Sequence, residues 1–96
     1  MLILVTYDVC TSDPGGKKRL RDVAKKCVCF GQRVQNSVFE CDVSPSELKE
    51  LQHSLEKIID LEKDSVRFYN IGKSYETKIT HIGCKTSYDP EGILFV

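Results

Sequence analysis

The chain begins with an unbroken apolar run that leaves few folds open to it. Residues 2–7, Leu-Ile-Leu-Val-Thr-Tyr, combine branched aliphatic and aromatic side chains and lack the regular polar alternation of a strand with one solvent-facing side. Strands of this kind are covered on both faces. We therefore predict a central strand here, buried inside its own domain or by a partner.

Apolar periodicity predicts a helix after the turn-forming stretch 11–16. Its apolar side is formed by Leu20, Val23, Ala24, Cys27 and Phe30. The glycine that follows, Gly31, is expected to end this helix.

Two short strands are expected within residues 33–43, on either side of the polar break 35–37. Residues 44–47, Ser-Pro-Ser-Glu, have the pattern of a capping box with proline at the first helical position, and leucines and isoleucines at spacings of three and four continue to Ile59. A strand over residues 64–71, ended by Gly72, follows this second helix.

The resulting order, βαββαβ, predicts a single α+β domain over residues 1–96 with the ferredoxin-like arrangement. Its core is expected to span residues 1–84, including a further strand from Thr77 to Cys84. Residues 85–96 are predicted to form a C-terminal tail. Because this tail ends in four apolar residues, 93–96, it either covers the edge of its own sheet or pairs with a second subunit.

Charge is balanced overall but uneven along the chain. The 14 Lys and Arg residues equal the 14 Asp and Glu residues, yet six bases lie between Lys17 and Lys26 with only Asp22 among them. A solvated helix face is one interpretation of this basic run. Binding of a polyanion is the other.

The cysteines and histidines give little sign of a metal or disulfide site. Five cysteines form no C-x-x-C pair, and the two histidines lack metal-ligand spacing. No stretch has the length and flanks of a signal peptide or a membrane span, so we expect a cytoplasmic protein that does not enter a membrane.

Asp8 is the most interesting polar residue because it directly follows the buried strand. One carboxylate is a poor metal site, but two brought together across a two-fold axis, with waters, suit Mg²⁺ or Mn²⁺. Such an ion activates water for attack on a phosphate. The alternative is a strand-end aspartate that caps the turn through Thr11 or Ser12.

Three segments together resemble a known family: Tyr7-Asp8-Val9, the basic stretch 16–25, and residues 31–41, which contain Arg-Val-Gln-Asn-Ser-Val-Phe-Glu. The chain resembles the second CRISPR-associated protein, a small adaptation protein, in the variant of subtype I-C systems. The resemblance implies a ferredoxin-like homodimer whose C-terminal tail packs on the partner's sheet. It also implies a role in spacer acquisition, in which the dimer bridges dimers of the CRISPR integrase, CRISPR-associated protein 1, along duplex DNA.

The resemblance further implies a metal-dependent endonuclease, acting on double-stranded DNA or single-stranded RNA with Mg²⁺, or Mn²⁺, as cofactor. By position, Asp8 matches the metal-binding catalytic acid, and Arg33 and Phe39 match residues linked to nuclease activity. The expected nucleic-acid contacts are Ser12, Lys17, Lys18, Arg19, Arg21 and Arg33. The residues themselves leave alternatives open, since Arg33 also suits a structural ion pair and Phe39 suits the core.

Two functions are consistent with these observations. The first is a metal-dependent phosphodiesterase in which Asp8 of both subunits binds one ion. The second is a non-catalytic architectural dimer that holds duplex DNA for the integrase.

Overall fold

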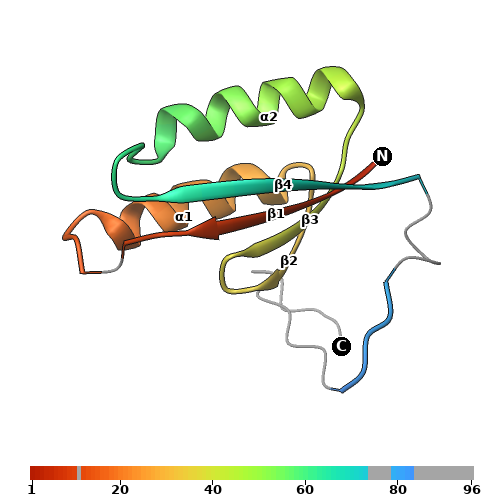
Figure 1. The fold of residues 1–96 in the computed structure, drawn as a ribbon, viewed down its shortest axis with the longest axis horizontal. Helices are drawn as coiled ribbons and strands as arrows, with labels where there is room; N and C mark the ends of the chain where they lie inside the picture. The colour runs from red at the N-terminus through yellow and green to blue at the C-terminus, as the bar shows by residue number, and fades with distance from the viewer. Residues whose placement is uncertain (11, 74–78, 84–96) are drawn as a thin grey trace.

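The computed structural model describes residues 1–10, 12–73 and 79–83. Its elements follow the predicted order (Figure 1) and are β1 (Leu2–Asp8), α1 (Gly16–Val28), β2 (Gly31–Gln35), β3 (Val38–Asp42), α2 (Pro45–Ile58) and β4 (Ser65–Gly72). The prediction of a small α+β domain with the βαββαβ order is confirmed.

The four strands form one antiparallel sheet in the order β2-β3-β1-β4. β1 lies in the interior of this sheet, where Val5 is opposite Phe39 of β3 and Phe68 of β4. The apolar run at the start of the chain therefore forms a central strand, as its composition predicts.

Both helices pack on the same face of the sheet. The side chains of Ile3, Val5 and Tyr7 on β1 belong to one buried cluster with residues of α1 and of α2. Between them, Leu4 and Thr6 are half-buried and Asp8 is exposed. Within the described residues, the helices thus cover the face of β1 that carries Ile3, Val5 and Tyr7, and Asp8 is exposed at the end of the other face.

The start of α2 shows the predicted capping box. The Ser44 hydroxyl accepts a hydrogen bond from the Glu47 backbone N–H at 3.2 Å, and the Glu47 carboxylate accepts one from the Ser44 N–H at 2.9 Å. Two backbone donors that the helix itself leaves unpaired are satisfied in this way.

Gly31 does not end α1, contrary to the prediction. The helix stops at Val28, and Gly31 is the first residue of β2. A Cβ atom at this position would collide with the Glu40 carbonyl oxygen and lie 2.6 Å from the Cα of Cys41. Glycine is needed here because the backbones of β2 and β3 approach each other closely.

The strand predicted from Thr77 to Cys84 does not form over its described part, since residues 79–83 are irregular. The rest of that stretch and the tail 85–96 lie outside the described residues. The four described cysteines, Cys10, Cys27, Cys29 and Cys41, are free thiols. No helix in the described part of the chain is long and apolar enough to cross a bilayer.

Candidate functional site

Asp8 lies at the end of β1 in a hollow on the face of the sheet opposite the helices. The hollow has a volume of about 370 Å³ and is lined by Thr6, Tyr7, Asp8, Ser37, Ser65, Arg67 and Tyr69. These residues come from β1, β4 and the turn between β2 and β3. The hollow thus surrounds an acid with polar side chains on an otherwise regular sheet.

The Asp8 carboxylate makes no hydrogen bond and no ion pair with any residue that the structure describes. It does not cap the turn through Ser12, whose hydroxyl lies 3.4 Å from the Cys10 sulfur instead. A rigidly held carboxylate without an internal partner is available to an external cation.

Arg67 contributes a positive charge to the same hollow. Its guanidinium Nη1 donates a hydrogen bond to the Tyr69 hydroxyl at 3.3 Å, and this bond raises the pKa of Arg67. The side chain is therefore protonated at every accessible pH. An arginine next to an unpaired carboxylate is suited to hold a phosphate oxygen while the carboxylate holds a cation.

One buried carboxylate, that of Asp64, binds groups on both sides of Asp8. Its Oδ2 accepts a hydrogen bond of 2.6 Å from the Tyr7 hydroxyl, and its Oδ1 accepts one of 3.1 Å from the Cys10 N–H. Because Tyr7 and Cys10 flank Asp8 in the sequence, Asp64 restrains the strand end from which the Asp8 side chain projects.

Arg19 neutralises Asp64. The guanidinium Nε and Nη2 donate to the two Asp64 oxygens at 2.7 and 3.2 Å. Burial alone would raise the pKa of Asp64, but the hydrogen bonds from Arg19, Tyr7 and the N–H groups of Asp60 and Cys10 outweigh it and hold the pKa well below its usual range. Asp64 is thus a buried anion at neutral pH.

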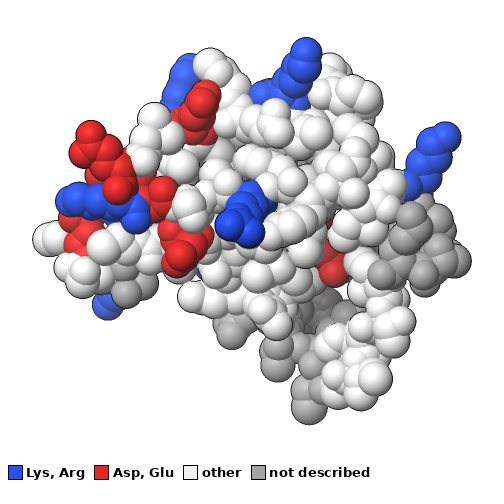
Figure 2. Space-filling view, in the orientation of Figure 1, with Lys and Arg blue, Asp and Glu red and all other residues white. Residues whose placement is uncertain are grey.

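The same guanidinium also binds Asp13, with Nη1 2.7 Å from the carboxylate, and Asp13 in turn pairs with Lys63 at 2.7 Å. Hydrogen bonds from Lys63 and Arg19 lower the pKa of Asp13 to about 2. Figure 2 shows acidic and basic side chains intermixed at this end of the molecule. The network ties the loop after β1 to the start of α1 and to the loop before β4.

Arg19 does not belong to an open basic face, contrary to its predicted role as a nucleic-acid contact. Its side chain is only 16% exposed, and its donors are engaged by Asp64 and Asp13. The physical reason is that an arginine between two carboxylates is held by more charge-assisted hydrogen bonds than a phosphate would offer at the surface.

The other predicted basic residues are on the surface of α1. Lys17, Lys18 and Arg21 are exposed, and Lys18 pairs with Asp22 at 2.8 Å. Lys17 and Arg21 line a separate groove next to β2. Ser12 is exposed but is not among the residues that line the Asp8 hollow.

Phe39 and Arg33 lie together, away from the Asp8 hollow. Phe39 is fully buried, opposite Val5 of β1, and does not line the hollow. The Arg33 guanidinium lies 5.5 Å from the centre of that ring, and its Nε donates to the Asn36 carbonyl at 2.8 Å. A single chain therefore does not bring Arg33 or Phe39 to Asp8.

A divalent ion needs more oxygen ligands than one chain supplies at Asp8. Among residues 1–10, 12–73 and 79–83 no group of three or more His, Cys, Asp or Glu side chains could hold a metal. Mg²⁺ is nevertheless commonly bound by one or two carboxylates with water completing its shell. The free Asp8 carboxylate fits half of such a site, and a second copy of Asp8 would supply the other half.

The sequence matches the family model described as CRISPR associated protein Cas2 over residues 1–79. The chain belongs to the Cas2 family. It is 58% identical over 91 residues to "CRISPR-associated endonuclease Cas2" of Halalkalibacterium halodurans, which covers 95% of each protein. It is 51% identical over 96 residues to "CRISPR-associated endoribonuclease Cas2" of Nitratidesulfovibrio vulgaris, covering 100% of this chain and 94% of that protein.

The fold agrees with this assignment. The crystal structure of Streptococcus pyogenes Cas2 at pH 6.5 superposes with a TM-score of 0.79 at 55% identity, covering 86% of this chain and 100% of the other. The resemblance seen in the sequence is thereby confirmed at the level of the Cas2 family. The subtype I-C variant stays a prediction.

Sequence reasoning missed two residues around Asp8: Arg67, which lines the same hollow, and Asp64, which binds the Cys10 N–H. Alternation along β4, with Ser65, Arg67 and Tyr69 exposed and Val66 and Phe68 half-buried, was a usable signal for Arg67. Asp64 gave no local signal, because three of the four partners of its carboxylate, Tyr7, Cys10 and Arg19, are distant in sequence.

Proposed function

We propose that this Cas2-family chain is a metal-dependent endonuclease that acts as a homodimer in CRISPR adaptation. The observation that carries the proposal is the Asp8 carboxylate, exposed, unpaired among the described residues, and held at the end of a central strand beside Arg67. The names of the two relatives, an endonuclease and an endoribonuclease, support a nuclease.

The metal site of this proposal contains Asp8 from each of two subunits, related by a two-fold axis, and its ion is Mg²⁺ or Mn²⁺. When bound, such an ion supplies an activated water and neutralises charge on the phosphate. In each subunit Asp64, neutralised by Arg19, helps to keep the Asp8 side chain in place, because it binds the Tyr7 hydroxyl on one side and the Cys10 backbone on the other.

Arg67 is proposed to orient the scissile phosphate. It lines the same hollow as Asp8. Its cross-strand partner in β1 is Thr6, which lies two residues before Asp8. Its planar guanidinium can donate two parallel hydrogen bonds to phosphate oxygens. Oriented binding of this kind lowers the barrier by placing the phosphorus in line with the attacking water.

The surface cations of α1 are proposed to hold the nucleic acid without reading its sequence. Lys17, Lys18 and Arg21 are exposed, and Arg33 adds a further charge on the neighbouring β2. Replacing Lys17, Lys18 and Arg21 together with glutamine should lower affinity for duplex DNA. It should also reduce the slope of log K against log salt by about 0.9 for each phosphate that the variant no longer neutralises.

An architectural role is the second candidate, and one observation favours it. Neither described histidine lines the Asp8 hollow, and no second acid lies in it, so the described residues offer no general base. In this account the dimer bridges dimers of the integrase, CRISPR-associated protein 1, and holds duplex DNA during spacer acquisition. The two roles are compatible in one protein.

The test is cleavage of labelled duplex DNA and single-stranded RNA with Mg²⁺, Mn²⁺ or EDTA. Asp8→Asn is compared with Asp42→Asn, which changes another exposed strand-end aspartate. Among the residues that the structure describes, the Asp42 carboxylate pairs only with the chain's amino group, at 3.3 Å. We expect metal-dependent cleavage by the wild type and Asp42→Asn and none by Asp8→Asn. Equal cleavage by all three proteins would refute the role of Asp8. Absence of cleavage with DNA binding retained would favour the architectural role.

A further inference from the structure

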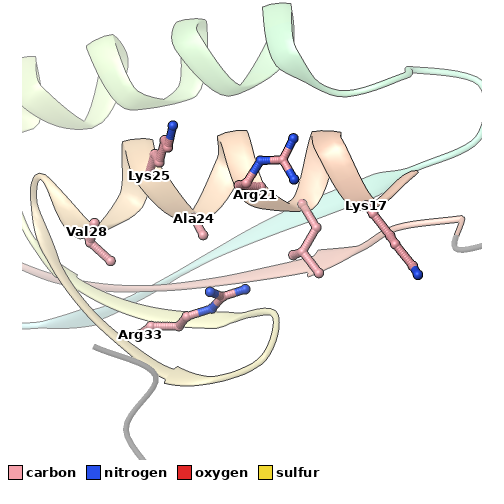
Figure 3. A pocket seen from close by; sticks show the side chains of 7 residues that line it. Lys17, Arg21, Ala24, Lys25, Val28 and Arg33 are labelled. Carbon is pink, nitrogen blue, oxygen red and sulfur yellow. The ribbon is translucent and has the colours of Figure 1, made fainter. Parts of the chain in front are cut away.

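A groove between α1 and β2 combines an apolar floor with a basic rim. It has a volume of about 330 Å³, and it is lined by Lys17, Leu20, Arg21, Ala24, Lys25, Val28 and Arg33. Figure 3 shows Ala24 and Val28 on α1 close to Arg33 of β2, with Lys17, Arg21 and Lys25 spread along the helix. The volume is within the range of sites that bind small ligands or a few side chains.

The lining residues of α1 form two parallel rows. The apolar row is Leu20, Ala24 and Val28, and the basic row is Lys17, Arg21 and Lys25. Members of each row are four residues apart, and thus lie about 6 Å from one another along the helix. A ligand that matches the groove therefore carries negative charges at a repeat of about 6 Å beside a continuous apolar edge.

No acid lines this groove among the residues that the structure describes. Asp22, on the same helix, is paired with Lys18, which lies outside the groove, at 2.8 Å. Arg33 is held over the Phe39 ring and bonded to the Asn36 carbonyl, and these interactions fix its position at the rim. The groove thus combines four basic side chains with an apolar floor and has no carboxylate among its lining residues.

We propose that this groove binds an extended segment of a partner protein in which acidic and apolar residues alternate. Alternate residues of an extended chain are about 6.6 Å apart on the same side, close to the repeat of the basic row. Charge complementarity alone would also admit a nucleic-acid backbone. The apolar floor favours the peptide, because phosphates and sugars gain nothing from Leu20, Ala24 and Val28 whereas leucine-sized side chains do.

The position of β2 supports an extended occupant. β2 is the last strand of the sheet, and within the described residues it pairs only with β3. An extended segment that lies along the groove between α1 and β2 directs its alternate residues to opposite sides, one set toward the basic row and the other toward the apolar row. This inference goes beyond the proposed nuclease function. The groove contains Lys17 and Arg21, which are also proposed nucleic-acid contacts. We therefore expect the peptide and DNA to compete for binding.

The test uses the full chain and three labelled heptapeptides, measured by fluorescence anisotropy. The first alternates Glu and Leu, the second replaces each Leu with Ser, and the third replaces each Glu with Gln. We expect the first peptide to bind at least tenfold more tightly than either of the others, because it alone engages both floor and rim. Unlabelled duplex DNA should displace it.

Two lysine variants provide a matched comparison. Lys25→Gln removes a rim charge, whereas Lys57→Gln removes an exposed charge of α2, outside the groove. Lys25→Gln should weaken binding of the Glu-Leu peptide about two- to fivefold, and Lys57→Gln should leave it unchanged. Because the readout is peptide binding, the result does not depend on whether the protein cleaves nucleic acid.

Three results would overturn the proposal. The Glu-Ser peptide binding as tightly as the Glu-Leu peptide would show that the floor plays no part. Equal weakening by Lys57→Gln and Lys25→Gln would show a diffuse charge effect. Failure of the Glu-Leu peptide to bind at millimolar concentration, with duplex DNA binding sensitive to Lys25→Gln, would assign the groove to nucleic acid.

Discussion

Arg19 and Asp64 are 45 residues apart in the sequence, yet the Arg19 Nε lies 2.7 Å from the Asp64 carboxylate. The side chain of Asp64 is completely buried and that of Arg19 is 16% exposed. The pair lies directly beneath the strand end that carries Asp8, since Asp64 also accepts hydrogen bonds from Tyr7 and Cys10. The Arg19–Asp64 ion pair is therefore connected by hydrogen bonds to the residues on either side of the candidate metal ligand, Asp8.

Asp64→Asn should destabilise the fold by about 1–3 kcal/mol. The amide keeps one acceptor oxygen but loses the charge, so that the Arg19 guanidinium or the Tyr7 hydroxyl loses a partner. Urea unfolding followed by circular dichroism measures this change. Glu62→Gln, an exposed acid in the same loop, is the control and should stay within about 0.5 kcal/mol of the wild type. A destabilisation no greater than in this control would contradict the account of Asp64.

Stability should fall steeply with acid below about pH 4. The pKa of Asp13 is about 2 and that of Asp64 is also lowered in the fold, while both groups titrate near 3.9 when unfolded. Their contribution is therefore fully present above the unfolded pKa and is lost as pH falls through the folded values. Urea midpoints at pH steps between about 6 and 2 should show this loss, with a shallower decline in Asp64→Asn. Parallel declines would contradict the prediction.

Gly31→Ala should destabilise the sheet by about 1–3 kcal/mol, because its Cβ would overlap the Glu40 carbonyl oxygen. The β2 and β3 backbones must separate to relieve the overlap. Thermal unfolding should show a lower Tm by several degrees. Gln35→Ala, an exposed change at the other end of β2, should be nearly neutral. An unchanged Tm in Gly31→Ala would show that the two strands need not approach so closely.

Arg67→Gln should lower the rate of metal-dependent cleavage by about 10- to 100-fold, as expected from the loss of a charged hydrogen bond to phosphate. Arg67→Lys should restore only part of it, because lysine cannot donate two parallel bonds. Lys73→Gln, at an exposed position just after β4, controls for the loss of one surface charge. Equal rates for Arg67→Gln and Lys73→Gln would remove Arg67 from the proposed site.

The sequence was sufficient to predict the elements that local chemistry determines. The apolar run of β1 and the capping box at Ser44 both have direct physical signatures, and Asp8 was correctly placed at a strand end. The alternative prediction that Phe39 belongs to the core is confirmed, since its side chain is fully buried.

Features that depend on distant contacts were not predictable in the same way. Arg19 looked like one more base in a basic run, although its position four residues before the buried Val23 was a sign that it lies near the core. Asp64 was predicted as the first residue of a strand, whereas it lies just before β4, and its burial arises only when β1, α1 and the loop before β4 converge. Such a network can be recognised only in the folded chain.

The most direct test of the shared metal site is a Mn²⁺ titration in which free Mn²⁺ is followed by electron paramagnetic resonance. The account predicts one tightly bound ion for every two chains in the wild type and in Asp42→Asn, and none in Asp8→Asn. One ion per chain, or a stoichiometry that Asp8→Asn leaves unchanged, would contradict it.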